Sequence, residues 1–270
     1  MAASRTLAAT PSTEGSGRLA ARRVRKGDEM RPTQTGDRSA AEASGPDLYK
    51  MLERMPILAG LPATSIGKLA SEARMTRFSR GQTIFRRGTA PTGLYFVIGG
   101  SVKLLAQDAD GREKVIELFS SGQMFGEIGI FMHSSYRSWA QAIDRCTLVH
   151  VERHHVMQAI ESDQELSGRM LREVSSRVQK LIDAICTTSS RLGVTRVASY
   201  LSELSERAHE SAQVQLPAPK RTVASLLSLT HESFSRILRR LIDDRVIEMS
   251  GRKVTILDRD KLKSLIVNSE

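Results

Sequence analysis

The sequence predicts an α+β chain: a β-rich barrel or jelly roll, then one long helix, then a small helical unit that ends in a two-stranded hairpin. Three observations predict it. Short β-branched runs alternate with glycines between residues 82 and 151, a later stretch has apolar residues 3 and 4 apart, and amphipathic segments near the C-terminus precede two alternating runs. The 270 residues allow about two domains, and 40% hydrophobic residues can supply a core for each.

The N-terminal residues 1–46 are rich in Ala, Ser, Thr, Gly, Pro and Arg and contain hardly any large apolar groups. Such a segment cannot bury enough surface to offset the entropy of ordering, so we expect a disordered tail. Met30 and Met51 are alternative start positions, and residues 1–29 therefore need not belong to the native protein.

Composition also excludes several classes of protein. No apolar run approaches the roughly 20 residues that a membrane-spanning helix needs, and the N-terminus lacks the apolar core of a secretory signal. The two cysteines, Cys146 and Cys186, offer no disulfide framework and cannot supply the four cysteine ligands of an iron–sulfur cluster. We therefore expect a cytoplasmic protein, and its net charge of +10 agrees with a polyanionic partner.

The first folded unit, residues 47–160, is expected to be a sensor-type barrel. Its flank at 48–73 has a helical pattern, and its strand candidates are 94–98, 102–105, 114–118 and 147–151. The sequence Asp-Ala-Asp-Gly at 108–111 is typical of a turn. Several short strands at this spacing indicate a β-barrel or jelly roll.

Residues 161–192 are expected to form a long dimerisation helix. Its apolar seam consists of Leu171, Val174, Val178, Leu181 and Ile185. Separations of 3, 4, 3 and 4 are those of a two-stranded coiled coil, which favours a homodimer. The alternative is that this seam packs on the chain's own barrel.

The last unit, residues 193–270, has the pattern of a winged helix-turn-helix. Residues 222–229 indicate a short helix with Thr222 as its N-cap, and a second helix follows after a tight turn. Alternating runs at 246–249 and 254–257, on either side of Ser-Gly-Arg, predict a two-stranded wing.

The second of these helices has a buried face and a polar face. Apolar residues recur at the helical period: Phe234, Ile237, Leu238 and Leu241. The opposite face carries Glu232, Ser235, Arg236 and Arg239, which are side chains that can contact base edges or phosphates. Because phosphate would repel a carboxylate, Glu232 suggests a hydrogen bond from a cytosine amino group. An ordinary amphipathic helix with a solvated charged face is the alternative.

A second set of polar residues lies in the barrel, at Gly126-Glu127-Ile128-Gly129 and at Arg137-Ser138. Glycine allows a ligand to approach the backbone, Ser138 can donate a hydrogen bond to a phosphate, and Arg137 can neutralise its charge. Glu127 would then accept a hydrogen bond from a ribose hydroxyl. An arginine–glutamate surface pair is the structural alternative.

The order of these parts, over about residues 48–267, resembles the Crp/Fnr family of transcription regulators. The resemblance implies that Gly126, Glu127, Ile128, Arg137 and Ser138 form a phosphate-binding cassette for cAMP or cGMP. It also places Leu181 and Ile182 beside the base, where the cAMP-responsive branch has a Thr-Ser pair. The effector is thus left open between the two nucleotides or neither, and no other cofactor is expected.

The resemblance further implies a bacterial, homodimeric regulator of a two-fold symmetric operator, with RNA polymerase as a partner. Glu232 to Arg236 matches the E-x-x-S-R pattern of the Fnr and Dnr branches, which implies half-sites related to TTGAT. The expected DNA-binding residues are Lys220, Arg221, Thr222, Thr230, His231, Glu232, Ser235, Arg236 and Arg239.

Two other functions remain open: a Dnr-like regulator that responds to haem or nitric oxide, and a nucleotide-binding regulatory subunit that acts on a protein partner. His150 and His154 have a spacing that could bind a metal on a helix, but the segment reads as a strand that runs into a helix, so we expect no metal site. No nucleophile–base arrangement is present, and we expect no enzymatic activity.

Overall fold

The computed structural model describes residues 45–108, 110–132, 134–189, 193–208 and 211–267, and the side chains of 183–189 and 267 lie outside this description. Nearly all of the expected tail, 1–46, therefore falls outside it, as do the side chains of Ile185 and Cys186. Within the described residues, no helix is long and apolar enough to cross a membrane.

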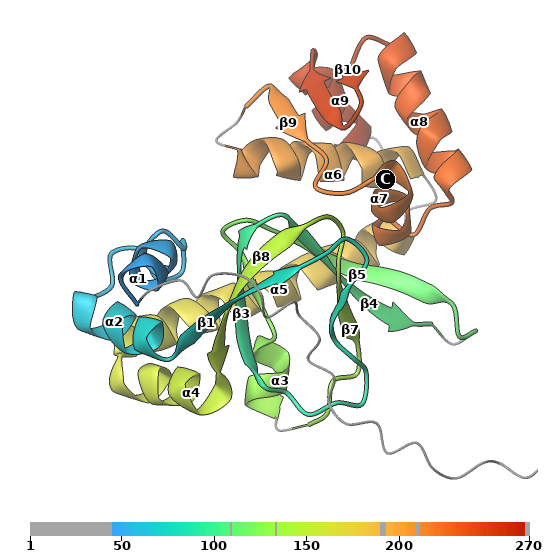
Figure 1. The fold of residues 1–270 in the computed structure, drawn as a ribbon. Helices are drawn as coiled ribbons and strands as arrows, with labels where there is room; N and C mark the ends of the chain where they lie inside the picture. Colours follow the sequence, from blue (N-terminus) through green and yellow to red (C-terminus); the bar gives the residue numbers. More distant parts are fainter. Residues whose placement is uncertain (1–44, 109, 133, 190–192, 209–210, 268–270) are drawn as a thin grey trace, which may run out of the picture. The chain divides into compact units, whose positions relative to one another are not determined.

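The sensor unit consists of two four-stranded antiparallel sheets. One has the order β1-β8-β3-β6, with β1 (Ala73–Phe78), β3 (Gly93–Gly99), β6 (Met124–Phe125) and β8 (Cys146–Glu152). The other has the order β2-β7-β4-β5, with β2 (Thr83–Phe85), β4 (Ser101–Gln107), β5 (Glu113–Ser120) and β7 (Trp139–Ala142). The predicted jelly roll is confirmed, and all four strand candidates lie within observed strands (Figure 1).

The flank expected to be helical at 48–73 consists of two helices. α1 (Gly45–Glu53) and α2 (Ala63–Ser71) are separated by turns, and β1 begins at Ala73. Pro56 and Pro62 explain the break, because proline has no N–H to donate to the preceding turn of a helix. Figure 1 shows α1 and α2 at one end of the barrel, together with α4 (Arg153–Ser162).

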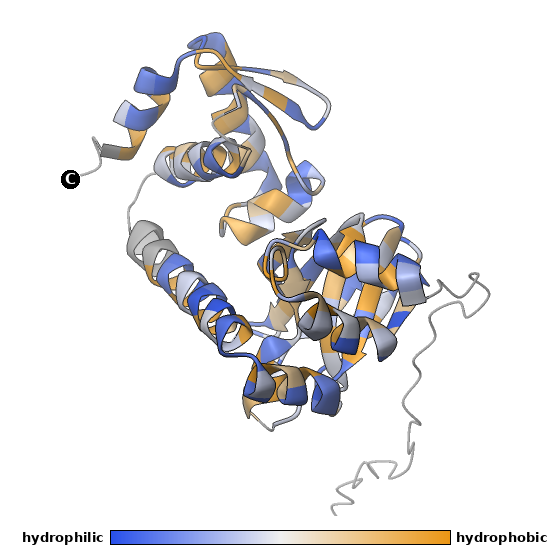
Figure 2. Cartoon of the chain, turned by 90° about the vertical axis from the view of Figure 1, so that its left-hand side faces the viewer, coloured by the Kyte–Doolittle hydropathy of each residue, from blue (hydrophilic) through white to orange (hydrophobic). Residues whose placement is uncertain are grey.

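The long helix α5 (Gln164–Ser189) packs on the barrel through one face only. Leu166 and Met170 are buried in a cluster with Phe96, and the Arg169 guanidinium donates to the carbonyls of Ile57 at 3.2 Å and Ala59 at 2.6 Å. Figure 2 shows polar and apolar residues interleaved along this helix.

The predicted seam lies on a different face of α5. Leu171, Val178 and Leu181 are 68%, 50% and 52% exposed, and Val174 is half-buried. The alternative, in which the seam packs on the chain's own barrel, is therefore wrong for these three exposed positions.

The C-terminal unit is a winged helix-turn-helix with a three-stranded sheet. Its helices are α6 (Gly193–Arg207), α7 (Lys220–Leu226), α8 (His231–Asp243) and α9 (Arg259–Val267), and its strands are β9 (Gln213–Gln215), β10 (Ile247–Ser250) and β11 (Lys253–Ile256). The sheet order is β10-β11-β9, so the predicted two-stranded wing gains a third strand. Sequence reasoning missed β9 because it has three residues and one apolar side chain, Val214, which pairs with Val254.

The expected N-cap of α7 is wrong. The helix starts at Lys220 after Pro219, and Thr222 already lies in its first turn, where its N–H donates to the Pro219 carbonyl at 2.8 Å. Pro219, with φ −55°, is the N-cap instead, so the helix starts at Lys220, three residues earlier than the Val223 start that a threonine cap would give.

Candidate effector pocket and nucleic-acid interface

The interior of the barrel is lined with aromatic rings. Phe85 stacks on Tyr136 with ring centroids 3.8 Å apart, and Tyr95 stacks on Phe125 at 5.1 Å. Phe119 lies a further 5.1 Å from Phe125. All five rings are buried and pack together in one apolar core cluster of the barrel, next to the residues of the expected phosphate cassette.

Gly126 is required where the chain passes from β6 into the next segment. Its φ of +101° disfavours other residues, and a Cβ there would lie 2.8 Å from the Gly93 carbonyl oxygen. Gly129 is also tightly packed, since a Cβ would lie 2.7 Å from the Pro91 ring. At both positions, therefore, contacts within the chain itself require glycine; the approach of a ligand to this backbone stays a prediction.

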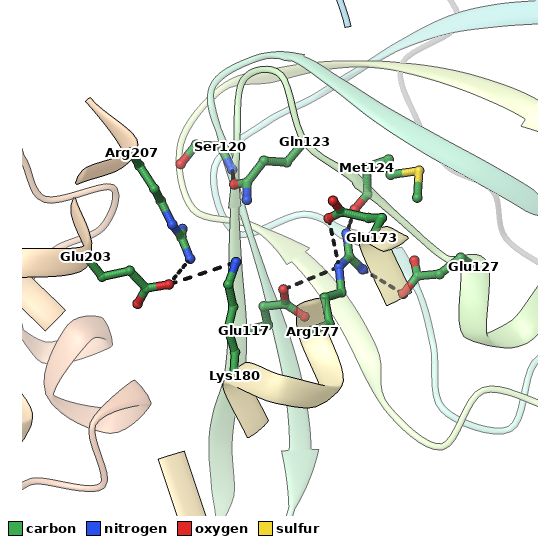
Figure 3. A network of polar contacts seen from close by, with 10 residues as sticks. All are labelled: Glu117, Ser120, Gln123, Met124, Glu127, Glu173, Arg177, Lys180, Glu203 and Arg207. Carbon is green, nitrogen blue, oxygen red and sulfur yellow. Dashed lines mark hydrogen bonds and ion pairs between the residues drawn. The ribbon is translucent and has the colours of Figure 1, made fainter. Parts of the chain in front are cut away.

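Glu127 is the first residue of the short helix α3 (Glu127–Met132), and it is buried, with 3% of its surface exposed. Its Oε1 accepts a hydrogen bond from Arg177 Nη1 of α5 at 2.6 Å. Arg177 Nη2 also donates to the Met124 carbonyl (Figure 3). The alternative of a surface pair is therefore wrong, because Glu127 is buried and its partner is Arg177.

Arg177 is surrounded by carboxylates. Its Nε lies 3.3 Å from Glu173 Oε1 and 3.7 Å from Glu117 Oε1, and its guanidinium carbon lies 5.1 Å from the centre of the Phe119 ring. Burial would lower the pKa of Arg177, but the carboxylates of Glu127, Glu117 and Glu173 outweigh it, and the pKa is raised. The charged guanidinium of Arg177 thus forms ion pairs with three carboxylates.

Glu117 has the longest ion pair of the three carboxylates around Arg177. Burial raises its pKa, and Arg177 opposes that rise. Its side chain is 34% exposed. Within the described part of the chain it has the one ion pair to Arg177 and no hydrogen bond.

Arg137 and Ser138 follow an anchored residue. The N–H of Tyr136 donates to the Thr89 carbonyl at 3.0 Å, and its carbonyl accepts from Gly88 N–H at 2.8 Å. Arg137 is exposed and Ser138 is half-buried, immediately before β7. An exposed arginine on a fixed backbone is available to an anion without breaking an internal contact.

The other expected effector residues are largely exposed. Ile128 is 64% exposed on α3, so it can contribute through its backbone rather than its side chain. Leu181 and Ile182 are 52% and 47% exposed on α5, one turn beyond Arg177.

Three histidines that are close together in the sequence lie on two elements. His150 is in β8, His154 and His155 are in α4, and the described residues contain no group of three or more metal-binding side chains. Burial lowers the pKa of His150 to about 4, so its ring, which lies 4.5 Å from the Tyr95 ring, is neutral at physiological pH. Cys146 is buried, and burial raises the pKa of its thiol to about 12.

A side chain of α6 stabilises the turn between α7 and α8 by hydrogen bonds to its backbone. Ser228 has φ +54°, an uncommon value for a residue other than glycine, and Arg196 Nη1 donates to the carbonyls of Leu227 at 2.8 Å and Ser228 at 3.2 Å. Thr230 is the N-cap of α8, and its Oγ1 accepts from the Ser233 N–H at 3.1 Å. The predicted tight turn is confirmed.

The polar face of α8 is open. Phe234, Leu238 and Leu241 are buried as predicted, and Ile237 is half-buried. The opposite face has exposed His231, Glu232, Arg236 and Arg239 and half-buried Ser235. Within the described residues, neither Arg236 nor Arg239 has an ion pair, whereas Arg240 Nε lies 3.7 Å from Asp244 Oδ2. On α7, Arg221 is exposed, and Lys220 and Thr222 are half-buried.

Three polar residues of these sites were missed by sequence reasoning: Glu117, Arg177 and Arg196. A signal existed for Arg177, because Leu166, Met170, Glu173 and Arg177 are spaced 4, 3 and 4 apart on the barrel side of α5. For Glu117 and Arg196 the partners are distant in sequence, and no local pattern marks them.

Comparison with known proteins identifies both parts. Residues 75–163 match the cyclic nucleotide-binding domain, and residues 195–265 match the Crp-like helix-turn-helix domain. The chain belongs to the Crp/Fnr family of transcription regulators. This Crp/Fnr protein is accordingly a DNA-binding regulator and not an enzyme.

Relatives of this Crp/Fnr protein match nearly the whole of its folded part. The "CRP-like cAMP-activated global transcriptional regulator" of Mycobacterium tuberculosis is 27% identical over 221 residues, which cover 79% of this chain and 97% of the relative. The "CRP-like protein Clp" of Xanthomonas campestris is 25% identical over 205 residues, covering 73% and 89%. FixK2 of Bradyrhizobium japonicum has the same fold, with a TM-score of 0.65 at 23% identity, over 72% of this chain and 96% of FixK2.

Proposed function

We propose that this regulator is a homodimer that binds a cyclic nucleotide in its barrel and reads a two-fold symmetric operator with its two α8 helices. RNA polymerase is part of the proposal as a partner at promoters, which rests on family membership alone.

The observation that carries the effector proposal is the state of Glu127. Its Oε2 is buried and has no hydrogen-bond partner among the described residues, while Oε1 is held by Arg177. A buried acceptor left unpaired costs about 1–3 kcal/mol. A ribose hydroxyl would satisfy this oxygen, and Arg137 and Ser138 would bind the cyclic phosphate.

Arg177 connects this site to the proposed dimer interface. It lies on α5, next to Val178 of the seam, and it holds Glu127 at 2.6 Å. A ligand that binds Glu127 changes the surroundings of Arg177 and thereby of α5. The proposed mechanism is a shift of population toward the dimer whose α8 helices lie about one DNA turn apart.

Calorimetric titration of the full chain with cAMP and with cGMP tests the effector proposal. We expect saturable binding of at least one nucleotide, and Arg137→Ala is expected to weaken it by about 1.5–3 kcal/mol, because a charged hydrogen bond to the phosphate is lost. Arg80→Ala is the matched control, since Arg80 is an exposed arginine of the same barrel.

Absence of heat with either nucleotide would overturn the effector proposal and leave DNA binding intact. A Soret band on haem addition, lost on substitution of a histidine, would then favour the haem alternative.

The base-reading proposal assigns Glu232, Ser235 and Arg236 of α8 to an operator with inverted TTGAT half-sites. Arg236→Ala is expected to lower affinity for this operator by about 1–3 kcal/mol, with little change for a scrambled duplex, because a bidentate contact to guanine is lost. Fluorescence anisotropy over a salt series measures both affinities.

Arg240→Ala is the matched control for this experiment, because Arg240 lies one turn further along α8 and is paired with Asp244. It should leave base preference unchanged. Equal loss on both duplexes in Arg236→Ala would assign Arg236 to phosphate and not to a base.

A further inference from the structure

Glu117 points into the barrel from β5. The strand register pairs it with Leu104 of β4, and Leu104 pairs with Ala140 of β7. Directly paired residues lie on the same face of a sheet, and Ala140 belongs to the buried aromatic-lined core. Phe119, two residues further along β5, belongs to the same core. The carboxylate of Glu117 is therefore on the inward face.

Its position suits the base of a nucleotide whose phosphate is bound at the start of β7. Ala140 follows Ser138 by two residues, and Glu117 lies two strands away from Ala140 across the sheet, which is about 10 Å. This is of the order of the length of a nucleotide from its phosphate to the far edge of its purine. Glu127 and Glu117 are linked through Arg177, at 2.6 Å and 3.7 Å, so the ribose partner lies beside the base position (Figure 3).

The chemistry of a carboxylate discriminates between purines. Ionised Glu117 can only accept hydrogen bonds, and among the described residues it accepts none. The Watson–Crick edge of guanine presents two adjacent donors, N1–H and the N2 amino group, which match the two carboxylate oxygens. Adenine presents an acceptor at N1 there, which would face a carboxylate oxygen.

The other charged groups near Glu117 are compatible with this role. Arg177 is shared with Glu127 and Glu173, at 2.6 Å and 3.3 Å, both closer than Glu117. Burial and the carboxylates of Glu127 and Glu173 raise the pKa of Glu117, whereas Arg177 and Lys180 oppose that rise and favour its ionised form.

We infer that Glu117 reads the guanine edge and makes this pocket selective for cGMP over cAMP. The inference rests on the proposed nucleotide effector.

Titration of the full chain with both nucleotides, in the wild type and in Glu117→Gln, tests it. The wild type is expected to bind cGMP about ten- to a hundredfold more tightly than cAMP, as a charge-assisted pair of hydrogen bonds allows. Glu117→Gln should lose most of this preference through weaker cGMP binding, with cAMP binding retained. Because burial already disfavours the charge of Glu117, the neutral amide should fold normally, which circular dichroism checks.

Glu113→Gln is the matched control, since Glu113 is exposed at the start of the same strand. Preference for cAMP in the wild type, or an unchanged cGMP preference in Glu117→Gln, would overturn the role of Glu117 and leave the nucleotide effector standing. Binding of neither nucleotide would overturn the effector proposal itself, and the role of Glu117 with it.

Discussion

Arg177→Ala is expected to lower the free energy of unfolding of the sensor unit by about 3–5 kcal/mol, because it leaves the buried carboxylate of Glu127 without its charge partner. The side chains of Arg177 and Glu127 are 11% and 4% exposed, so water cannot replace the lost contact. Urea denaturation monitored by circular dichroism measures the change.

Arg172→Ala is the matched control, because Arg172 is an exposed arginine on the same helix. A rescue variant adds a second check: Glu127→Gln in an Arg177→Met background removes the uncompensated charge and should recover part of the stability. If Arg177→Ala were as stable as Arg172→Ala, the 2.6 Å pair would not be a structural link between barrel and helix.

Val178→Glu is expected to convert the proposed dimer to monomers. Val178 is at the centre of the predicted seam, where the two copies would face each other, and a buried carboxylate there would weaken association by about 3 kcal/mol or more, roughly a hundredfold in Kd. Analytical ultracentrifugation measures the change. Affinity for a two-half-site operator should fall with it, while the fold of each protomer is retained because Val178 is 50% exposed there.

Ser176→Glu adds the same charge at an exposed position on another side of α5 and serves as the control. The coiled-coil interpretation of the seam would be refuted by a Val178→Glu protein that sediments as the wild type does.

Local sequence patterns were sufficient for most of the fold. Short β-rich runs punctuated by glycine predicted the strands β3, β4, β5 and β8, and the 3.6-residue period predicted the buried face of α8. Errors occurred where the pattern is short or interrupted by proline: the start of α7 after Pro219 and the three-residue strand β9.

The residues of the candidate sites likewise fall into two groups: those that the sequence suggested and those that it did not. Some candidate residues belong to short local motifs and could be proposed from motif and spacing; examples are Gly126, Arg137 and Arg236. Glu117 and Arg177 were not, since β5 and α5 are far apart in the sequence and meet only in the folded barrel.

The sequence by itself determined the order of the parts, the buried and polar faces of α8, and the family, because these depend on periodicity and on motifs of consecutive residues. Only the tertiary structure decided that Glu127 is buried and held by Arg177, that Leu171 and Val178 are left open, and that Glu117 faces the barrel interior. Burial and charge pairing between distant segments depend on which surfaces the fold brings together, and one-dimensional patterns do not contain that information.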